Sequence, residues 1–94
     1  MLTVEAARMA VRLTNDKFDE ELQNLINAAI LDLSRVGIEL QRNDDLYDQA
    51  LRMYVKGNFE PGAPEAEACR RIYSDIKTDL KLSEDYREED DDDA

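Results

Sequence analysis

Residues 45–60, DLYDQALRMYVKGNFE, form the stretch that decides the fold, because it is apolar on nearly every side of a helix. Its apolar side chains are Leu46, Tyr47, Ala50, Leu51, Met53, Tyr54 and Val55. They leave a narrow polar stripe made of Asp48, Gln49, Arg52 and Lys56. A surface helix buries one side, whereas a helix that is apolar on most sides needs neighbours around it. We therefore expect this segment to be the centre of the fold.

Two helices are predicted before this segment. The first is expected over residues 4–13, with Thr3 as its N-cap. Its candidates for the inward face are Val4, Ala7, Val11 and Met9. The second is expected over residues 16–36, where apolar side chains recur every three or four positions for about five turns. Gly37 then fits the position just past the C-terminus of a helix.

A fourth helix is predicted after the breaker-rich loop FEPGAP, residues 59–64. Pro64 suits the first position of that helix. The face expected to be buried carries Ala68, Cys69, Ile72, Tyr73, Ile76 and Leu80. No stretch alternates between apolar and polar residues over the length of a strand. The sequence thus predicts an all-α fold, a compact bundle of about four helices within residues 1–83.

The charge is unevenly divided along the chain. The 94 residues suit one domain, and their net charge is −11. Residues 84–94 hold eight acids and one base, a net charge of −7, and residues 88–93 are all acidic. Such a run repels itself and has no apolar period, so we expect a disordered acidic tail over residues 84–94. Residues 1–83 are then the single folded domain, with a net charge of −4.

Composition excludes several classes of function. The chain has no His and one Cys, so one copy cannot assemble a usual zinc site, a Cys–His pair or a Ser–His–Asp triad. No basic stripe suits the gripping of phosphates, and no apolar run is long enough to span a membrane. We therefore predict a protein that is not an enzyme, with no catalytic, cofactor-binding or metal-binding residues and no cofactor.

The acidic clusters are better explained by helix starts than by metal binding. Asp44 and Asp45 precede the central helix, and Asp16, Asp19 and Glu20 precede or open the second. Acidic side chains cap helices and favour the positive end of the helix dipole. No calcium-binding loop of the Asp-x-Asp-x-Asp-Gly kind is present. These carboxylates are therefore interpreted as caps.

Three other features have a structural and a functional interpretation. Cys69 is interpreted as a small buried hydrophobe, with a reactive thiol as the alternative. Arg70 and Arg71 form the only adjacent basic pair, which suits a solvated helix face or a contact with an acidic partner. Tyr residues 47, 54 and 73 could stack on bases, but at helical spacing on apolar faces they favour a core role.

Three segments resemble the phage head–tail connector family of small all-helical adaptors. They are LINAAILDL (residues 25–33), DQALRMYVKGNF (residues 48–59) and YSDIKTDLKLSEDY (residues 73–86). The resemblance covers roughly residues 1–86 and lies in the order, length and texture of the helices. None of the three segments is a catalytic signature.

The resemblance implies a ring of copies bound to the portal protein at the head–tail junction of the virion. Such a ring would extend the DNA channel and join the head to a stopper or tail-completion protein after DNA packaging. DNA would pass through without sequence-specific binding, no membrane would be involved, and assembly would take place in the host cytoplasm. The alternative is an acidic regulatory or DNA-mimic protein that occupies a basic partner through residues 88–93.

Overall fold

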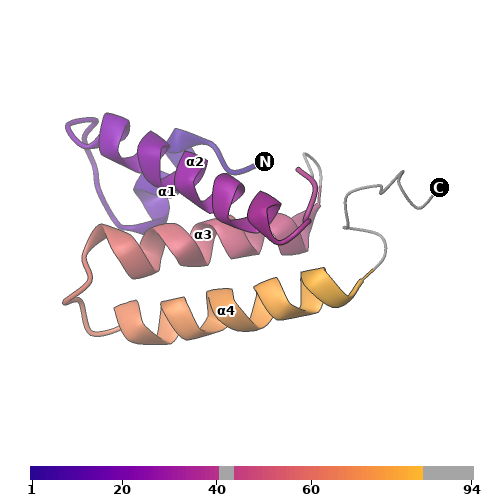
Figure 1. Cartoon of the computed structure of the whole chain (residues 1–94). Coiled ribbons are helices and arrows are strands. Elements are labelled where there is room, and N and C mark those ends of the chain that lie inside the picture. Colours follow the sequence, from indigo (N-terminus) through magenta and orange to yellow (C-terminus); the bar gives the residue numbers. More distant parts are fainter. Residues whose placement is uncertain (41–43, 84–94) are drawn as a thin grey trace.

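Four helices make up the part of the chain that the structure, a computed structural model, describes: residues 1–40 and 44–83. They are α1 (Val4–Ala10), α2 (Asp19–Arg35), α3 (Asp45–Phe59) and α4 (Ala66–Leu82) (Figure 1). No strand occurs within these residues, and the predicted all-α bundle is confirmed. The predicted disordered tail, residues 84–94, lies outside the described part of the chain.

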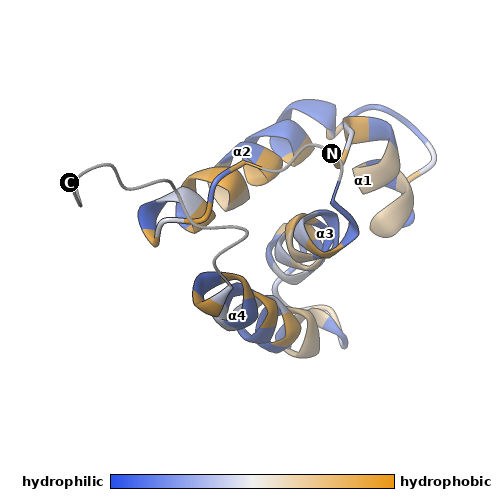
Figure 2. Cartoon of the chain, turned by 90° about the vertical axis from the view of Figure 1, so that its right-hand side faces the viewer, coloured by the Kyte–Doolittle hydropathy of each residue, from blue (hydrophilic) through white to orange (hydrophobic). Residues whose placement is uncertain are grey.

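Helix α3 lies at the centre, as predicted from its apolar side chains on nearly every side. It packs against α1, α2 and α4, and Figure 2 shows the other three helices arranged around it. Its buried residues are Tyr47, Ala50, Leu51, Met53, Val55 and Gly57. Leu46 was expected among them but is 40% exposed in the first turn; it precedes the buried Tyr47 by one position, which rotates it about 100° around the helix. The centre of the core is therefore a single helix that its three neighbours enclose.

Helix α1 is shorter than expected and buries less. Thr3 caps it as predicted, and its Oγ1 accepts a hydrogen bond of 3.1 Å from the amide of Ala6. The helix ends at Ala10 and not near residue 13, since Arg12 adopts a left-handed φ of 62°. Met9 is 76% exposed, so its assignment to the inward face is wrong. Two positions past the buried Ala7, it points about 200° away around a helix of 3.6 residues per turn.

Helix α2 begins later than predicted and ends where predicted. The expected start at residue 16 is wrong because residues 15–18 form a turn, in which Asn15 Oδ1 accepts from the Lys17 amide at 2.9 Å. Gly37 follows the helix with a φ of 86°, which confirms its role as the residue just past the end. Its amide donates to the carbonyl of Ser34, and the Ile38 amide donates to that of Leu33, both at 3.0 Å.

Helix α4 begins at Ala66, so Pro64 lies in the preceding loop and does not occupy the first helical position. The buried face consists of Ala66, Cys69, Tyr73, Ile76 and Leu80. Ala68 and Ile72 were assigned to that face, but Ala68 is exposed and Ile72 is 43% exposed. Each precedes a buried residue by one position, which rotates it about 100° off the stripe that contacts α3.

Candidate interaction site

The acidic residues at the helix starts act partly as caps and partly as ion-pair partners. Asp44 caps α3, and its Oδ1 accepts from the Tyr47 amide at 2.9 Å. Asp45 lies in the first turn of α3, and Asp19 and Glu20 lie in that of α2. The N-cap of α2 is Phe18 and forms no side-chain cap bond, so the capping interpretation fails at this helix. The acids in its first turn instead stabilise the helix through their favourable interaction with the positive end of the helix dipole.

Arg8 and Asp19 join α1 to α2. The guanidinium donates two hydrogen bonds to the carboxylate, from Nε to Oδ1 at 2.9 Å and from Nη2 to Oδ2 at 2.7 Å. These hydrogen bonds hold the pKa of Asp19 below its usual value and raise that of Arg8. A bidentate pair of this kind fixes direction as well as distance. The short α1, whose single fully buried residue within its span is Ala7, is oriented by this pair.

Asp32 joins α2 to α4 across the side of α3. Its Oδ2 accepts from the Tyr73 hydroxyl at 2.5 Å and from Lys77 Nζ at 2.9 Å. Burial raises the pKa of Asp32, but the hydrogen bonds from Tyr73 and Lys77 outweigh it, so the net shift is downward. Burial, and then the bond to Asp32, raise the pKa of the Tyr73 hydroxyl. This cluster ties together the two helices that flank α3.

The tyrosines and the cysteine belong to the core, as predicted. Tyr47 is fully buried and Tyr73 is 8% exposed. The half-buried Tyr54 meets Tyr73 edge-on, with ring centroids 5.1 Å apart at an interplanar angle of 74°. Cys69 is 5% exposed on the inner face of α4. The rings of Tyr47 and Tyr73 are covered, and Tyr54 packs against the core beside Tyr73, so the structure favours the core interpretation for all three tyrosines.

The two adjacent arginines have different roles. Arg71 lies on the solvated face, with its guanidinium 4.0 Å from the carboxylate of Glu67. Arg70 folds over α3 and donates from Nη1 to the carbonyl of Gly57 at 2.6 Å. A Cβ atom at position 57 would lie 2.6 Å from Cγ of Arg70, so only glycine allows this approach. Both arginines are exposed, so the solvated-face interpretation holds for the pair, and Arg70 in addition contacts the backbone of α3. The mid-helix glycine is the sequence signal for this close crossing.

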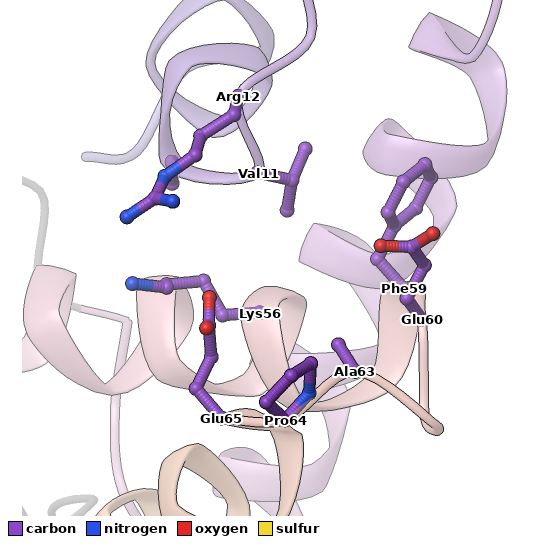
Figure 3. A pocket seen from close by; sticks show the side chains of 9 residues that line it. Val11, Arg12, Lys56, Phe59, Glu60, Ala63, Pro64 and Glu65 are labelled. Atoms are coloured by element: carbon purple, nitrogen blue, oxygen red, sulfur yellow. The ribbon is translucent and has the colours of Figure 1, made fainter.

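A pocket of about 270 Å³ opens where the C-terminus of α1 meets the loop between α3 and α4 (Figure 3). It is lined by Ala10, Val11, Arg12, Lys56, Phe59, Glu60, Ala63, Pro64 and Glu65. Its apolar wall is supported from behind, because the ring of Phe59 meets that of Phe18 edge-on at 5.5 Å. We call this site the α1–loop pocket.

Two cations lie at the mouth of the α1–loop pocket. Figure 3 shows the end groups of Arg12 and Lys56 on the same side of the pocket, with the Glu65 carboxylate beside the Lys56 side chain and Glu60 on the far side beside Phe59. Across residues 1–40 and 44–83, neither cation takes part in a salt bridge or a side-chain hydrogen bond. Sequence reasoning missed this site, because nothing in the pattern of residues signals a left-handed arginine or brings residue 12 next to residue 56.

No metal centre is evident in the described part of the chain. Within residues 1–40 and 44–83, no three His, Cys, Asp or Glu side chains are grouped so that they could hold an ion. No described helix combines the length and the apolar character that crossing a bilayer requires. The prediction that the chain carries no catalytic, cofactor-binding or metal-binding residues stays a prediction.

A family model described as phage connector protein matches residues 2–87. The chain belongs to the phage connector protein family. The comparisons with curated proteins and with solved structures found no match. The matched span includes all four helices and both residues at the mouth of the α1–loop pocket.

Family membership gives the protein its general role. A connector is a component of the virion that associates with other head or tail proteins, and the family is generally structural and not enzymatic. The part of the molecule that matters for such a role is its outer surface. Ion pairs hold the peripheral helices together, and the α1–loop pocket opens on the outer surface.

Proposed function

We propose that this connector is an adaptor that assembles as a ring on the portal, extends the DNA channel and joins the head to a stopper or tail protein after DNA packaging. The family match over residues 2–87 carries this proposal. In it, the portal, neighbouring copies and the stopper or tail-completion protein are the partners. The ring resides at the head–tail junction and assembles in the host cytoplasm.

The cross-linked packing of the helices suits a subunit that bears load between two larger assemblies. The Arg8–Asp19 pair fixes α1 on α2, and Asp32 fixes α2 to α4 through Tyr73 and Lys77. Between them α3 is enclosed, with Leu51 and Val55 fully buried. Rigid subunits lose less conformational entropy on assembly than flexible ones. Such a bundle can carry outward-facing contacts without rearrangement of its core.

The charge of the chain suits the passage of DNA. Residues 1–83 carry 15 acids and 11 bases, and the whole chain has a net charge of −11. Proteins that grip DNA do so mainly by neutralising phosphates with Lys and Arg. A ring built from acidic subunits would offer few such contacts, so DNA would slide through it without binding to a particular sequence.

The test is electron microscopy of the cognate portal ring after incubation with an excess of the chain. The proposal predicts an added ring of density below the portal, made of copies of this chain that are related by rotational symmetry. A matched control uses the chain with Leu51→Asp, which places an unpaired charge in the fully buried core and should abolish the folded subunit. Portal particles without added density at saturating chain concentration would contradict the proposal.

The alternative, a DNA-mimic or regulatory protein, depends on the acidic residues 88–93. Removal of residues 84–94 separates the two. An adaptor that ends at residue 83 retains all four helices and should still bind the portal. A mimic without its acids should lose its basic partner. Portal binding that the truncated chain retains would contradict the alternative.

A further inference from the structure

The backbone at Arg12 adopts a conformation that residues other than glycine rarely take. Helix α1 ends in a Schellman motif, in which the amide of Leu13 donates to the carbonyl of Arg8 at 2.9 Å and that of Arg12 to Met9 at 3.0 Å. This motif requires a left-handed residue, and Arg12 supplies it with a φ of 62°. Glycine adopts that conformation without the steric penalty that a Cβ atom brings. The fold alone is therefore better served by glycine, and the arginine needs an explanation outside the fold.

The α1–loop pocket offers three kinds of binding group. Arg12 and Lys56 are cations that no described residue neutralises. Glu60 and Glu65 are acids at the loop side of the pocket, and the ring of Phe59 forms an apolar wall. A simple anion would meet the two acids as well as the two cations. The site instead suits a peptide that carries a ring, a cation and several acids in succession.

We propose that the occupant is the acidic tail, residues 84–94, of a second copy of this chain. Its sequence, EDYREEDDDDA, presents a ring at Tyr86, a cation at Arg87 and six acids at residues 88–93. Against the pocket, the ring would lie on Phe59, the cation would meet the loop acids, and the acidic run would meet Arg12 and Lys56. Opposite charges that meet in this order give specificity for one direction of the bound segment.

The first residues of the same copy's tail, which carry the ring and the cation, cannot reach the pocket. Glu65 of the pocket adjoins the first turn of α4, and residue 84 follows the opposite end of that helix (Figure 1). With 17 residues, α4 is about 25 Å long. An extended chain gains about 3.3–3.6 Å per residue, so Tyr86 reaches about 10 Å back from residue 83 and Glu88 about 18 Å. The ring, the cation and the start of the acidic run therefore need another copy.

Such a contact is heterologous, because the pocket of one copy receives the tail of the next. Repeated contacts of this kind close into a ring when the rotation between copies allows it. The inference thus deepens the proposed function and rests on it for the supply of neighbouring copies. It gives Arg12 and the acidic residues 88–93 a shared role.

The test is NMR titration of the isotope-labelled full chain with a synthetic peptide of residues 84–94. Saturable amide shifts are expected at residues 10–12 and 56–65, and should weaken as salt rises, since exposed charge pairs are screened. Lys56→Gln with Arg12→Gly should weaken peptide binding about five- to twentyfold, the loss of two partly exposed pairs. A peptide with amides in place of the six acids should bind equally weakly.

A matched variant controls for total charge. Arg71→Gln with Lys81→Gln removes two exposed cations of α4 that do not line the pocket, and should leave peptide affinity unchanged. Equal loss in both double variants, or shifts that avoid the pocket, would overturn the proposal. So would short duplex DNA that produces the pocket shifts when the peptide does not. Portal rings without peptide binding would overturn this contact alone, whereas peptide binding without portal rings would contradict the proposed function alone.

Discussion

Helices α1 and α2 end in the same hydrogen-bonded motif, but the two ends are built from opposite chemistry. Past α2, Gly37 takes the left-handed position with a φ of 86°, and the flanking Leu33 and Ile38 are both buried in the core. Past α1, Arg12 takes that position with a φ of 62°, Leu13 is half-buried, and Arg8 is ion-paired to Asp19. The C-terminal end of α2 packs into the core, whereas the C-terminal end of α1 borders the α1–loop pocket and its unpaired cations.

This difference separates scaffold from contact surface. The α2 end has the residue that the backbone conformation prefers and apolar neighbours that stabilise it. The α1 end has a residue that the backbone tolerates at a cost of about 1–2 kcal/mol, and neighbours held by charge. A subunit that must be rigid inside and adhesive outside needs both kinds of end. Substitutions at the two ends should therefore differ in size and in kind.

The largest effect is expected at the apolar contact of the α2 end. Leu33→Ala should lower the free energy of unfolding by about 2–5 kcal/mol, because it opens a cavity at a fully buried site. Leu31→Ala is the matched control, two positions earlier and 52% exposed, and should change it by less than about 0.5 kcal/mol. Urea denaturation followed by circular dichroism measures both. Equal losses would show that the α2 end is not anchored in the core.

The next effect is expected at the left-handed glycine. A Cβ atom at position 37 would meet nothing within 4 Å, so Gly37→Ala adds backbone strain without a clash. The free energy of unfolding should fall by about 1–2 kcal/mol. Gly62→Ala, also in open space but without a left-handed φ, should be neutral or slightly stabilising. If Gly37→Ala changed the free energy of unfolding no more than Gly62→Ala does, the left-handed position past α2 would not require glycine, and the contrast between the two helix ends would be wrong.

The sequence predicted what depends on periodicity and capping. It predicted four helices, the central place of α3, the Thr3 cap, a cap at Asp44 or Asp45 and the glycine past α2, each from local chemistry or from a repeat along the chain. It misplaced Met9, Ile72 and Leu46, because the inner face of a short or widely apolar helix is set by its neighbours.

The α1–loop pocket could not be predicted for a related reason. It combines a backbone conformation that arginine rarely adopts with residues 44 positions apart in the chain, Arg12 and Lys56. Neither feature leaves a pattern in one sequence. The partners of Asp32, which are Tyr73 and Lys77, are also far away in the sequence. The hydrogen bonds that join α2 to α4 were therefore not predicted either.

A smaller loss of stability is expected at low pH, and it should affect the C-terminal end of α1 and not that of α2. The pKa of Asp19 lies below its ordinary value of 3.8 because Arg8 donates to its carboxylate. A lowered pKa in the folded state means that the pair stabilises the protein above that ordinary value, and that the stabilisation is lost as pH falls through the folded pKa. Below about pH 4, the α1 end should loosen before the apolar α2 end does.

Carbon-13 NMR of the carboxyl groups measures this difference. Arg8→Gln should raise the pKa of Asp19 toward its ordinary value, because it removes the charged donor. The pKa of Asp32, which is lowered by Tyr73 and Lys77, serves as the internal control and should not move. An Asp19 pKa that is unchanged in the variant would show that Arg8 does not hold the α1 end through this carboxylate.

The smallest change in stability is expected for Arg12→Gly. Its free energy of unfolding also gives the most direct test of the role assigned to Arg12. The central claim is that Arg12 serves a contact outside the subunit and not its fold. Glycine relieves the left-handed strain but adds freedom to the unfolded chain, so the variant should be as stable as the natural chain or more stable by up to about 1 kcal/mol. A fall of more than about 1 kcal/mol would contradict the claim, since it would show that the arginine side chain stabilises the fold.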